Sequence, residues 1–410
     1  MNSSYRHLIA ALTVLPLLAT AAPPQWHTTW MAAPQPAWDD HFVLPLSMPR
    51  TLRDATLRQV VRTSLGGARL RVVVSNEYGR APLNVGRLTV RHESLSAAQV
   101  LRFQGQELAV VPQGGRLTSD AIALPTRAGD RLALELHLPG PAELAGFHWD
   151  AREQAVLTTG GATQTVDARA FVTELQVEAD SAPAAVVAIG DSITDGNGAT
   201  PGRDQRWPDH LARRLAPQGM AVLNAGISGN RLLRDGMGES ALARFERDAL
   251  SHPGVRAVIV QLGTNDIGWP GGPFAPAEPL PTVEALAQGL TRLAGQAHRH
   301  GVRLIAATLP PFEDALKGTP LEGHYSPAKE ALRQALNQWI RQSDAFDGVV
   351  DFDAALRDPK HPARLRAEFD SGDHLHPGDE GYRAMAAAVE PAALLPISAT
   401  RPEPHSAHAR

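Results

Sequence analysis

Hydrophobic and polar positions follow two different patterns in the two halves of this chain. From about residue 42 to residue 178, apolar residues mostly alternate with polar ones, and residues 131–138 carry leucine at every second position. Such alternation is typical of an antiparallel strand that buries one face. Turn signals recur at residues 76–79, 114–115 and 128–130, without a strong helical pattern between them. The pattern predicts a β-sandwich or jelly-roll-like domain over residues 22–180.

A glycine pair in this half gives a more specific expectation. Gly66-Gly67 separates the apolar runs at residues 60–65 and 68–74. Two strand-like runs on either side of Gly-Gly are a hairpin signal, because glycine adopts the positive φ of a tight turn without steric cost. We therefore expect these two runs to pair with each other.

A second rhythm begins after Ser181-Ala182-Pro183. Short apolar runs at residues 184–189, 255–262 and 302–309 predict strands buried on both faces. Residues 282–300 place apolar side chains at alternating intervals of three and four, which predicts a helix between the last two strands. This alternation indicates an α/β domain with a parallel sheet over residues 184–396. The pattern continues with a helix opening at Ser326-Pro327, a strand at residues 349–352 and a polar tail at residues 397–410.

Composition narrows the possible functions. The chain has 410 residues and is 43% hydrophobic, which is enough for two cores. Its 39 basic and 43 acidic side chains are spread along the sequence and leave a formal net charge of -4. Because no basic stripe stands out, nucleic acid is not an expected partner. The absence of cysteine excludes disulfides, a thiol nucleophile and cysteine-ligated zinc.

The N-terminus has the features of an export signal. Residues 8–18 are mainly apolar and follow Arg6 and His7, and Ala19-Thr20-Ala21 has the small-residue pattern of a cleavage site. We expect residues 1–21 to be a signal peptide and the protein to be secreted or periplasmic. The apolar core is too short for a membrane span of roughly 20 residues, so no stable membrane insertion is expected.

A serine lies where an open α/β sheet binds its ligands. Ser192 comes directly after the first apolar run of the α/β half, and a late loop supplies Asp373 and His376 three residues apart. A serine hydroxyl needs a base to accept its proton, and a carboxylate on the other ring nitrogen holds the imidazole in the required tautomer. We therefore expect Ser192 as nucleophile, His376 as base and Asp373 as its orienting group. His374 is a weaker candidate base, and the loop taken alone would more readily fit polar residues that cap a neighbouring helix.

Two further strand ends offer hydrogen-bond donors for an oxyanion. Gly229 lies in the turn after the apolar run 221–223, where a glycine can present its backbone N–H at close range. Asn265 follows the apolar run 257–260 and offers its side-chain amide. Acyl transfer needs such donors, because negative charge develops on the carbonyl oxygen during attack. Four separate segments thus supply what a serine hydrolase requires.

The loop at residues 268–281 is a candidate substrate contact. It is rich in proline and glycine, begins directly after a strand end and contains Trp269 and Phe274. We expect this loop to overhang the active site. Trp26, Trp30 and Trp38 are weaker candidates for stacking on a sugar.

These segments resemble the four blocks of the SGNH, or GDSL, hydrolase superfamily. The likeness is carried, in order, by Gly190-Asp191-Ser192, an N-x-G-x-S-G-N run containing Gly229, Gly263-Thr264-Asn265-Asp266 and Asp373-x-x-His376. It implies a three-layer α/β/α flavodoxin-like catalytic domain over about residues 184–391, with no metal and no organic cofactor. It also implies that the Ser192 backbone N–H, Gly229 and Asn265 form the oxyanion hole.

The upstream half resembles that of secreted xylan-esterase-like SGNH proteins. Residues 30–35, residues 75–79 and the extended first block at 190–196 carry this likeness. It implies hydrolysis of a small acyl group such as acetyl from a carbohydrate, with acetylated polysaccharide as a candidate substrate. A lipid or lysophospholipid esterase and a broad arylesterase remain alternatives. Two further alternatives are a noncatalytic glycan-binding protein and a metal-dependent hydrolase whose ligands would be Asp191, Asp373, His374 and His376. The sequence does not indicate an oligomeric state.

Overall fold

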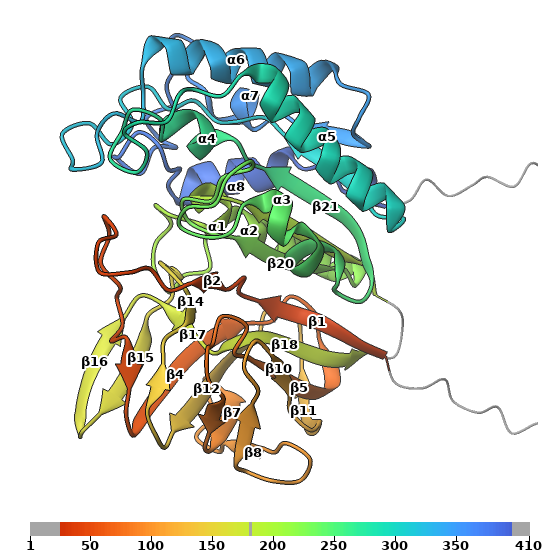
Figure 1. Cartoon of the computed structure of the whole chain (residues 1–410). Helices are drawn as coiled ribbons and strands as arrows, with labels where there is room; N and C mark the ends of the chain where they lie inside the picture. The colour runs from red at the N-terminus through yellow and green to blue at the C-terminus, as the bar shows by residue number, and fades with distance from the viewer. Residues whose placement is uncertain (1–24, 180–182, 396–410) are drawn as a thin grey trace, which may run out of the picture.

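The computed structural model describes residues 25–179 and 183–395 (Figure 1). The expected signal peptide at residues 1–21 and the expected tail at residues 397–410 lie outside the described residues. Figure 1 shows a β-rich N-terminal half below an α/β half, as the two sequence rhythms predict. Every helix in the described part of the chain falls short of the length and apolar character that crossing a membrane requires.

The N-terminal half is built on two antiparallel sheets. Alternating leucines of β12 are buried, Leu132 and Leu136 completely, and they pack into an apolar core shared with the other sheet. The predicted half-buried strand is therefore confirmed, and so is the β-rich domain. The five-stranded sheet contains β1 (Gln25–Met31), β18 (Val172–Ala179), β5 (Gly67–Ser75), β10 (Arg116–Thr118) and β11 (Ile122–Thr126). The six-stranded sheet contains β16 (Ala162–Val166), β15 (Ala155–Thr159), β4 (Ala55–Arg62), β12 (Arg131–Leu138), β7 (Leu88–His92) and β8 (Gln99–Leu101).

Seven short strands complete this half. Three of them form a small sheet that faces the α/β half, with β14 in its centre. They are β2 (Gln35–Pro36), β14 (Gly146–His148) and β17 (Arg169–Ala170), while β3 (Thr51–Leu52) pairs with β13 (Ala142–Glu143) and β6 (Leu83–Val85) with β9 (Ala109–Val111).

The hairpin predicted at Gly66-Gly67 is wrong. The strand before it, β4, pairs with β12 and β15, whereas the strand after it, β5, pairs with β18, β10 and β11. The polar groups of Thr63 and Ser64 explain the difference, because they bond to Asp130 and Thr29 rather than to β5. The glycines thus carry the chain from one sheet to the other, and the close approach of Gly66 to the Thr126 carbonyl leaves no room for a Cβ.

The α/β half contains a five-stranded parallel sheet. Its order is β20 (Ala221–Gly226), β19 (Ala185–Gly190), β21 (Val255–Gln261), β22 (Arg303–Ala307) and β23 (Gly348–Val350). In chain order this is 2-1-3-4-5, the flavodoxin-like arrangement. Every residue of β19 is buried, as its unbroken apolar run predicts. Ligands in such sheets bind at the strand carboxyl ends beside the switch point, which here lies between β19 and β21.

Helices cover both faces of this sheet, giving three layers. The Thr282 hydroxyl caps the helix predicted at residues 282–300, and Ser326 caps the one that begins with Pro327. One face carries α2 (Trp207–Leu215), α7 (Phe352–Leu356) and α8 (Asp379–Ala388), and the other carries α3 (Ala241–Phe245), α5 (Val283–Arg299) and α6 (Pro327–Gln342). Short turns complete the half: α1 (Ser192–Asp195), η1 (Ala216–Gln218), the π-helical η2 (Glu246–Leu250), α4 (Thr264–Gly268) and η3 (Pro391–Leu394).

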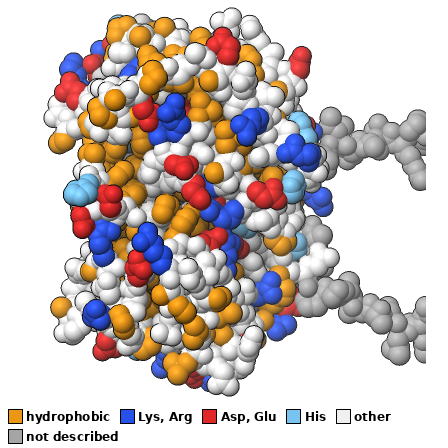
Figure 2. Space-filling model, viewed as in Figure 1, with side chains coloured by type: hydrophobic (Ala, Val, Ile, Leu, Met, Phe, Trp, Pro, Cys, Tyr) orange, Lys and Arg blue, Asp and Glu red, His pale blue; other side chains and the backbone are white. Residues whose placement is uncertain are grey.

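The two halves are packed directly against each other. Strand β1 lies along β20, the edge strand of the parallel sheet (Figure 1). The Trp38 indole donates to the Met237 carbonyl at 2.7 Å, and one apolar cluster extends from the β-sandwich core into the α/β core. Figure 2 shows acidic and basic side chains gathered along the seam between the halves. Apolar packing and polar contacts therefore hold the two halves together.

Candidate active site

The first predicted residue, Ser192, begins α1 directly after β19. The Asp191 side chain caps this short helix, because its Oδ1 accepts a hydrogen bond from the Ile193 N–H at 3.0 Å. Asp191 is fully buried, and this burial raises the pKa of its carboxyl group to about 7. The Ser192 side chain is thereby held at the switch point of the sheet.

Ser192, His376 and Asp373 form a continuous hydrogen-bonded row. The Nε2 atom of His376 lies 2.8 Å from the Ser192 Oγ, and its Nδ1 lies 2.6 Å from the Asp373 Oδ2. The other Asp373 oxygen, Oδ1, accepts the backbone N–H groups of Leu375 and His376 at 2.9 and 2.8 Å. Residues 373–376 thus form a turn that holds the Asp373 carboxylate against the His376 imidazole. The arrangement has the geometry of a hydroxyl, a base and an orienting carboxylate.

The environment of Asp373 favours its ionised form. Burial by itself would raise the pKa of this carboxyl group, but the hydrogen bonds and charge of His376 and the backbone N–H groups lower it far below its usual range. An ionised Asp373 holds the proton on the Nδ1 of His376, which leaves Nε2 as an acceptor facing Ser192. The neighbouring His374 is turned away, since its Nδ1 lies 2.5 Å from Asp370 and about half of its side chain is exposed.

The expected hydrogen-bond donors follow the two strands that flank β19, Gly229 after β20 and Asn265 after β21. Gly229 has φ of 71°, and an added Cβ would lie 2.1 Å from the Met237 sulfur, so the close backbone approach requires glycine. Among the described backbone contacts outside helices and strands, the N–H groups of Ser192 and Gly229 donate to no carbonyl. The Asn265 Nδ2 donates to the Asn230 carbonyl at 3.0 Å, which fixes the amide next to Gly229.

Two buried side chains that were not among the predicted site residues, Asp266 and Arg244, connect these loops. Asp266 accepts the backbone N–H groups of Leu232 and Leu233 at 2.7 and 3.0 Å and thereby ties the third block to the second. Arg244 is fully buried and donates to three atoms of the strand ends, namely the Gly190 carbonyl, the Ala225 carbonyl and the Asn230 Oδ1.

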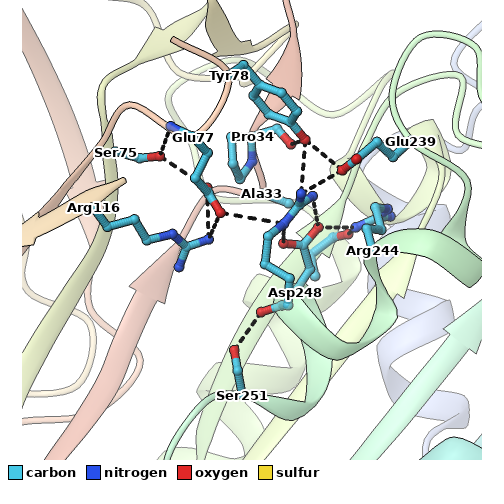
Figure 3. A network of polar contacts seen from close by, with 12 residues as sticks. Ala33, Pro34, Ser75, Glu77, Tyr78, Arg116, Glu239, Arg244, Asp248 and Ser251 are labelled. Carbon is cyan, nitrogen blue, oxygen red and sulfur yellow. Dashed lines mark hydrogen bonds and ion pairs between the residues drawn. The ribbon is translucent and has the colours of Figure 1, made fainter. Parts of the chain in front are cut away.

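Arg244 is also linked to the N-terminal half (Figure 3). It pairs with Asp248 at 3.2 Å, Asp248 pairs with Arg247 at 2.7 Å, and Arg247 donates to Tyr78 and to Glu239. Tyr78 belongs to the β-rich domain, so this network crosses the seam between the halves. Tyr78 lies in the 75–79 segment that carries the upstream likeness, whereas the charged members of the network gave no local sequence signal, because each is an ordinary charged residue.

The structure brings the two expected substrate contacts together. Trp269 and Phe274 stack with ring centroids 4.6 Å apart, and the Trp269 ring lies against Gly229. Phe274 is partly buried and approaches Phe42 of the N-terminal half at 6.0 Å. Trp30 and Trp38 are buried, and their positions give no open platform for a sugar ring.

Another contact joins the halves close to the nucleophile and continues within the α/β half. His148 Nε2 lies 2.9 Å from Asp195 Oδ1, and Asp195 Oδ2 accepts from the Ser228 N–H and hydroxyl. Asp195 lies in the first block that the sequence analysis quoted, whereas nothing local in the sequence marks His148. In residues 25–179 and 183–395, no group of three or more His, Asp or Glu side chains is arranged to hold a metal ion.

Comparison with known proteins identifies the family of the α/β half. Residues 186–389 match the family model described as GDSL-like Lipase/Acylhydrolase. No curated protein sequence matches the chain.

Several solved structures overlay on the chain at low similarity. A carbohydrate acetylesterase family member from Sinorhizobium meliloti is 19% identical over 51% of this chain and 96% of its own, with a TM-score of 0.39. A GDSL-like lipase from Bacteroides thetaiotaomicron VPI-5482 is 21% identical over 51% and 87%, with a TM-score of 0.37. A family two carbohydrate esterase from Cellvibrio japonicus is 13% identical over 91% and 95%, with a TM-score of 0.38.

Proposed function

Given that the chain is a carboxylic ester hydrolase whose residues 186–389 form a GDSL/SGNH superfamily domain, we propose that it is a serine esterase acting through Ser192. The observation that carries the proposal is the 2.8 Å contact between the Ser192 Oγ and the His376 Nε2. In the first half-reaction the Ser192 Oγ bonds to the ester carbon while His376 takes its proton. The alcohol then leaves with that proton, and an acyl-enzyme remains on Ser192.

Water completes the reaction by the same route. His376 removes a proton from the water, whose oxygen bonds to the acyl carbon, and Ser192 recovers its proton as the carboxylic acid leaves. In both steps the negative charge on the carbonyl oxygen is stabilised by the N–H groups of Ser192 and Gly229 and by the Asn265 amide. Asp373 stabilises the imidazolium that forms transiently.

For the substrate, we propose a small acyl ester of a carbohydrate, such as an acetylated polysaccharide. The resemblance of the upstream motifs to xylan-esterase-like proteins supports this class. Both motifs contact the α/β half, since the Gln35 side chain donates to the Met237 carbonyl and the Tyr78 hydroxyl donates to Glu239. Trp269 and Phe274 would form one wall of the substrate site. The proposal also includes export through a signal peptide at residues 1–21, with domains at residues 22–180 and 184–396.

The decisive experiment compares the purified protein with its Ser192→Ala variant. Acetyl, butyryl and long-chain esters of one phenol are assayed beside acetylated xylan. We expect fastest turnover of acetyl esters, release of acetate from xylan and loss of nearly all turnover in Ser192→Ala. Comparable turnover in Ser192→Ala would overturn the serine mechanism.

Other outcomes of the same panel would favour the alternatives. Faster cleavage of long-chain esters would indicate a lipid or lysophospholipid esterase, and turnover of all phenyl esters without acetate release from xylan would indicate an arylesterase. Activity lost in a chelator and restored by zinc or manganese would indicate a metal-dependent hydrolase. Glycan binding by both proteins without any ester cleavage would indicate a noncatalytic glycan-binding protein.

A further inference from the structure

A buried histidine of the β-rich domain contacts the helix that carries Ser192. His148 lies at the end of β14 and is 5% exposed, and its Nε2 is 2.9 Å from the Asp195 Oδ1. Asp195 is the last residue of α1, three positions after Ser192, and is 1% exposed. The contact therefore links the two halves at a point that solvent does not reach.

The second carboxylate oxygen of Asp195 bonds to Ser228, the residue before the proposed oxyanion donor Gly229. Its Oδ2 accepts the Ser228 backbone N–H at 3.1 Å and the Ser228 hydroxyl at 2.8 Å. The peptide bond after Ser228 carries the N–H of Gly229, so fixing Ser228 fixes the direction of that donor. Gly226 also packs against the Asp195 backbone, where an added Cβ would lie 2.3 Å from the Asp195 N. The turn after β20 and the end of α1 are thus fitted together with little freedom.

The partners of His148 indicate a charged ring. Its Nδ1 lies 2.9 Å from the Ala33 carbonyl, which can only accept, and its Nε2 faces a carboxylate. Both ring nitrogens donate, so the row contains a buried imidazolium and carboxylate that cross the seam. A buried pair of this kind holds its geometry firmly, because separating the charges leaves each without a partner.

We propose that His148 is a positioning residue that acts through Asp195 and Ser228 to aim the Gly229 N–H at the carbonyl oxygen of the substrate. This inference rests on the proposed ester hydrolysis. The β-rich domain then completes the catalytic domain, and it is not a separable module for binding glycan. Since oxyanion donors act mainly on the transition state, loss of the row lowers kcat more than it changes KM.

The primary test measures kcat, KM and Tm on an acetyl ester for His148→Ala and His148→Gln. Misplaced donors cost about 10- to 100-fold, so we expect His148→Ala to lose that much kcat with KM within about threefold. The glutamine amide can still donate to Asp195, and we expect His148→Gln to recover part of the loss. If His148→Ala does not fold, Asp195→Asn keeps the side-chain shape and is expected to give the same loss of kcat.

His27→Ala is the matched control. His27 is also a buried histidine of the β-rich domain at the seam, where it lies against Gly254, and it makes no hydrogen bond to Asp195. We expect a lower Tm with kcat within about twofold of wild type, because packing is lost without displacement of the donors. An equal loss of kcat in His27→Ala and His148→Ala would overturn the positioning role.

A double-mutant cycle tests whether His148 acts on the Gly229 N–H through Ser228. If His148 acts through Ser228, the His148→Ala/Ser228→Ala enzyme is about as slow as the slower single variant. Losses that multiply in the double variant, or a normal kcat in His148→Ala, would overturn the inference. The proposed function fails separately, if the parent protein cleaves no ester or if Ser192→Ala keeps its turnover.

Discussion

The imidazole of His376 is held between Asp373 and Ser192, with its Nε2 2.8 Å from the serine Oγ although 184 residues separate the two side chains. His374, in the same loop, has its own acidic partner, Asp370, and is about half exposed. Two histidines two residues apart thus have different surroundings, and they provide a matched pair for mutation.

We predict that His376→Ala lowers kcat by roughly 10⁴-fold or more, because the nucleophile loses its base. His374→Ala is expected to keep most of the activity. Initial rates on an acetyl ester, with circular dichroism of both variants, check the prediction. Similar activity in the two variants would mean that His376 is not the base.

Asn265→Ala should lower kcat by about 10²- to 10³-fold and leave KM nearly unchanged. The amide is expected to contact the oxygen only once negative charge develops on it. Steady-state kinetics with the same ester measure the two parameters separately. If KM alone rises, Asn265 binds substrate and does not stabilise the oxyanion.

Removal of the buried Arg244 guanidinium should destabilise the protein strongly. Arg244→Met removes the buried donor that Asp248 and three acceptors near the strand ends share, and we expect the free energy of unfolding to fall by about 3–5 kcal/mol. Urea unfolding measures the change. Arg383→Met, which breaks an exposed pair with Glu380, is the control and should cost less than about 1 kcal/mol. Equal losses in the two variants would contradict a central role for Arg244.

The stability that His148 contributes should depend on pH. Burial and Arg169 lower the pKa of His148, but the charge and hydrogen bond of Asp195 outweigh them and raise it above its ordinary 6.5. A raised pKa means that the folded state holds the proton more tightly than the unfolded state. The stabilisation is therefore complete below pH 6.5 and is lost as pH rises through the folded-state pKa. We expect the unfolding free-energy difference between wild type and His148→Gln to shrink on going from pH 5.5 to pH 9.

His27 is a control for which the expected pH dependence of stability has the opposite sign. Burial lowers the pKa of His27, so the unfolded state binds the proton more tightly and the wild-type histidine destabilises the fold as pH falls below 6.5. Urea unfolding of His27→Gln over the same pH range should show this reversed trend. A common trend in both variants would refute the assigned shifts.

Much of the α/β half could be predicted from the sequence, because local rules govern it. The unbroken apolar run before Ser192 predicts a strand that is buried on both faces. The caps at Thr282 and Ser326 set where two helices begin. The carboxyl ends of parallel strands share one edge, so residues that follow them were expected to meet there.

Pairing between distant segments was decided only by the tertiary structure. Gly66-Gly67 has the local chemistry of a hairpin, yet Thr63 and Ser64 bond to Asp130 and Thr29 and send the chain to the other sheet. A turn signal describes the backbone at one point and does not say which strand lies beside it.

Local sequence patterns therefore predicted the main helices and strands of the α/β half, the order of the four blocks and the side chains available at the sheet edge. Tertiary structure alone decided that His148 of the β-rich half meets Asp195, and that Arg244 joins the strand ends. The physical reason is range: periodicity and caps act within a few residues, whereas a buried ion pair forms wherever packing brings two charges together away from water.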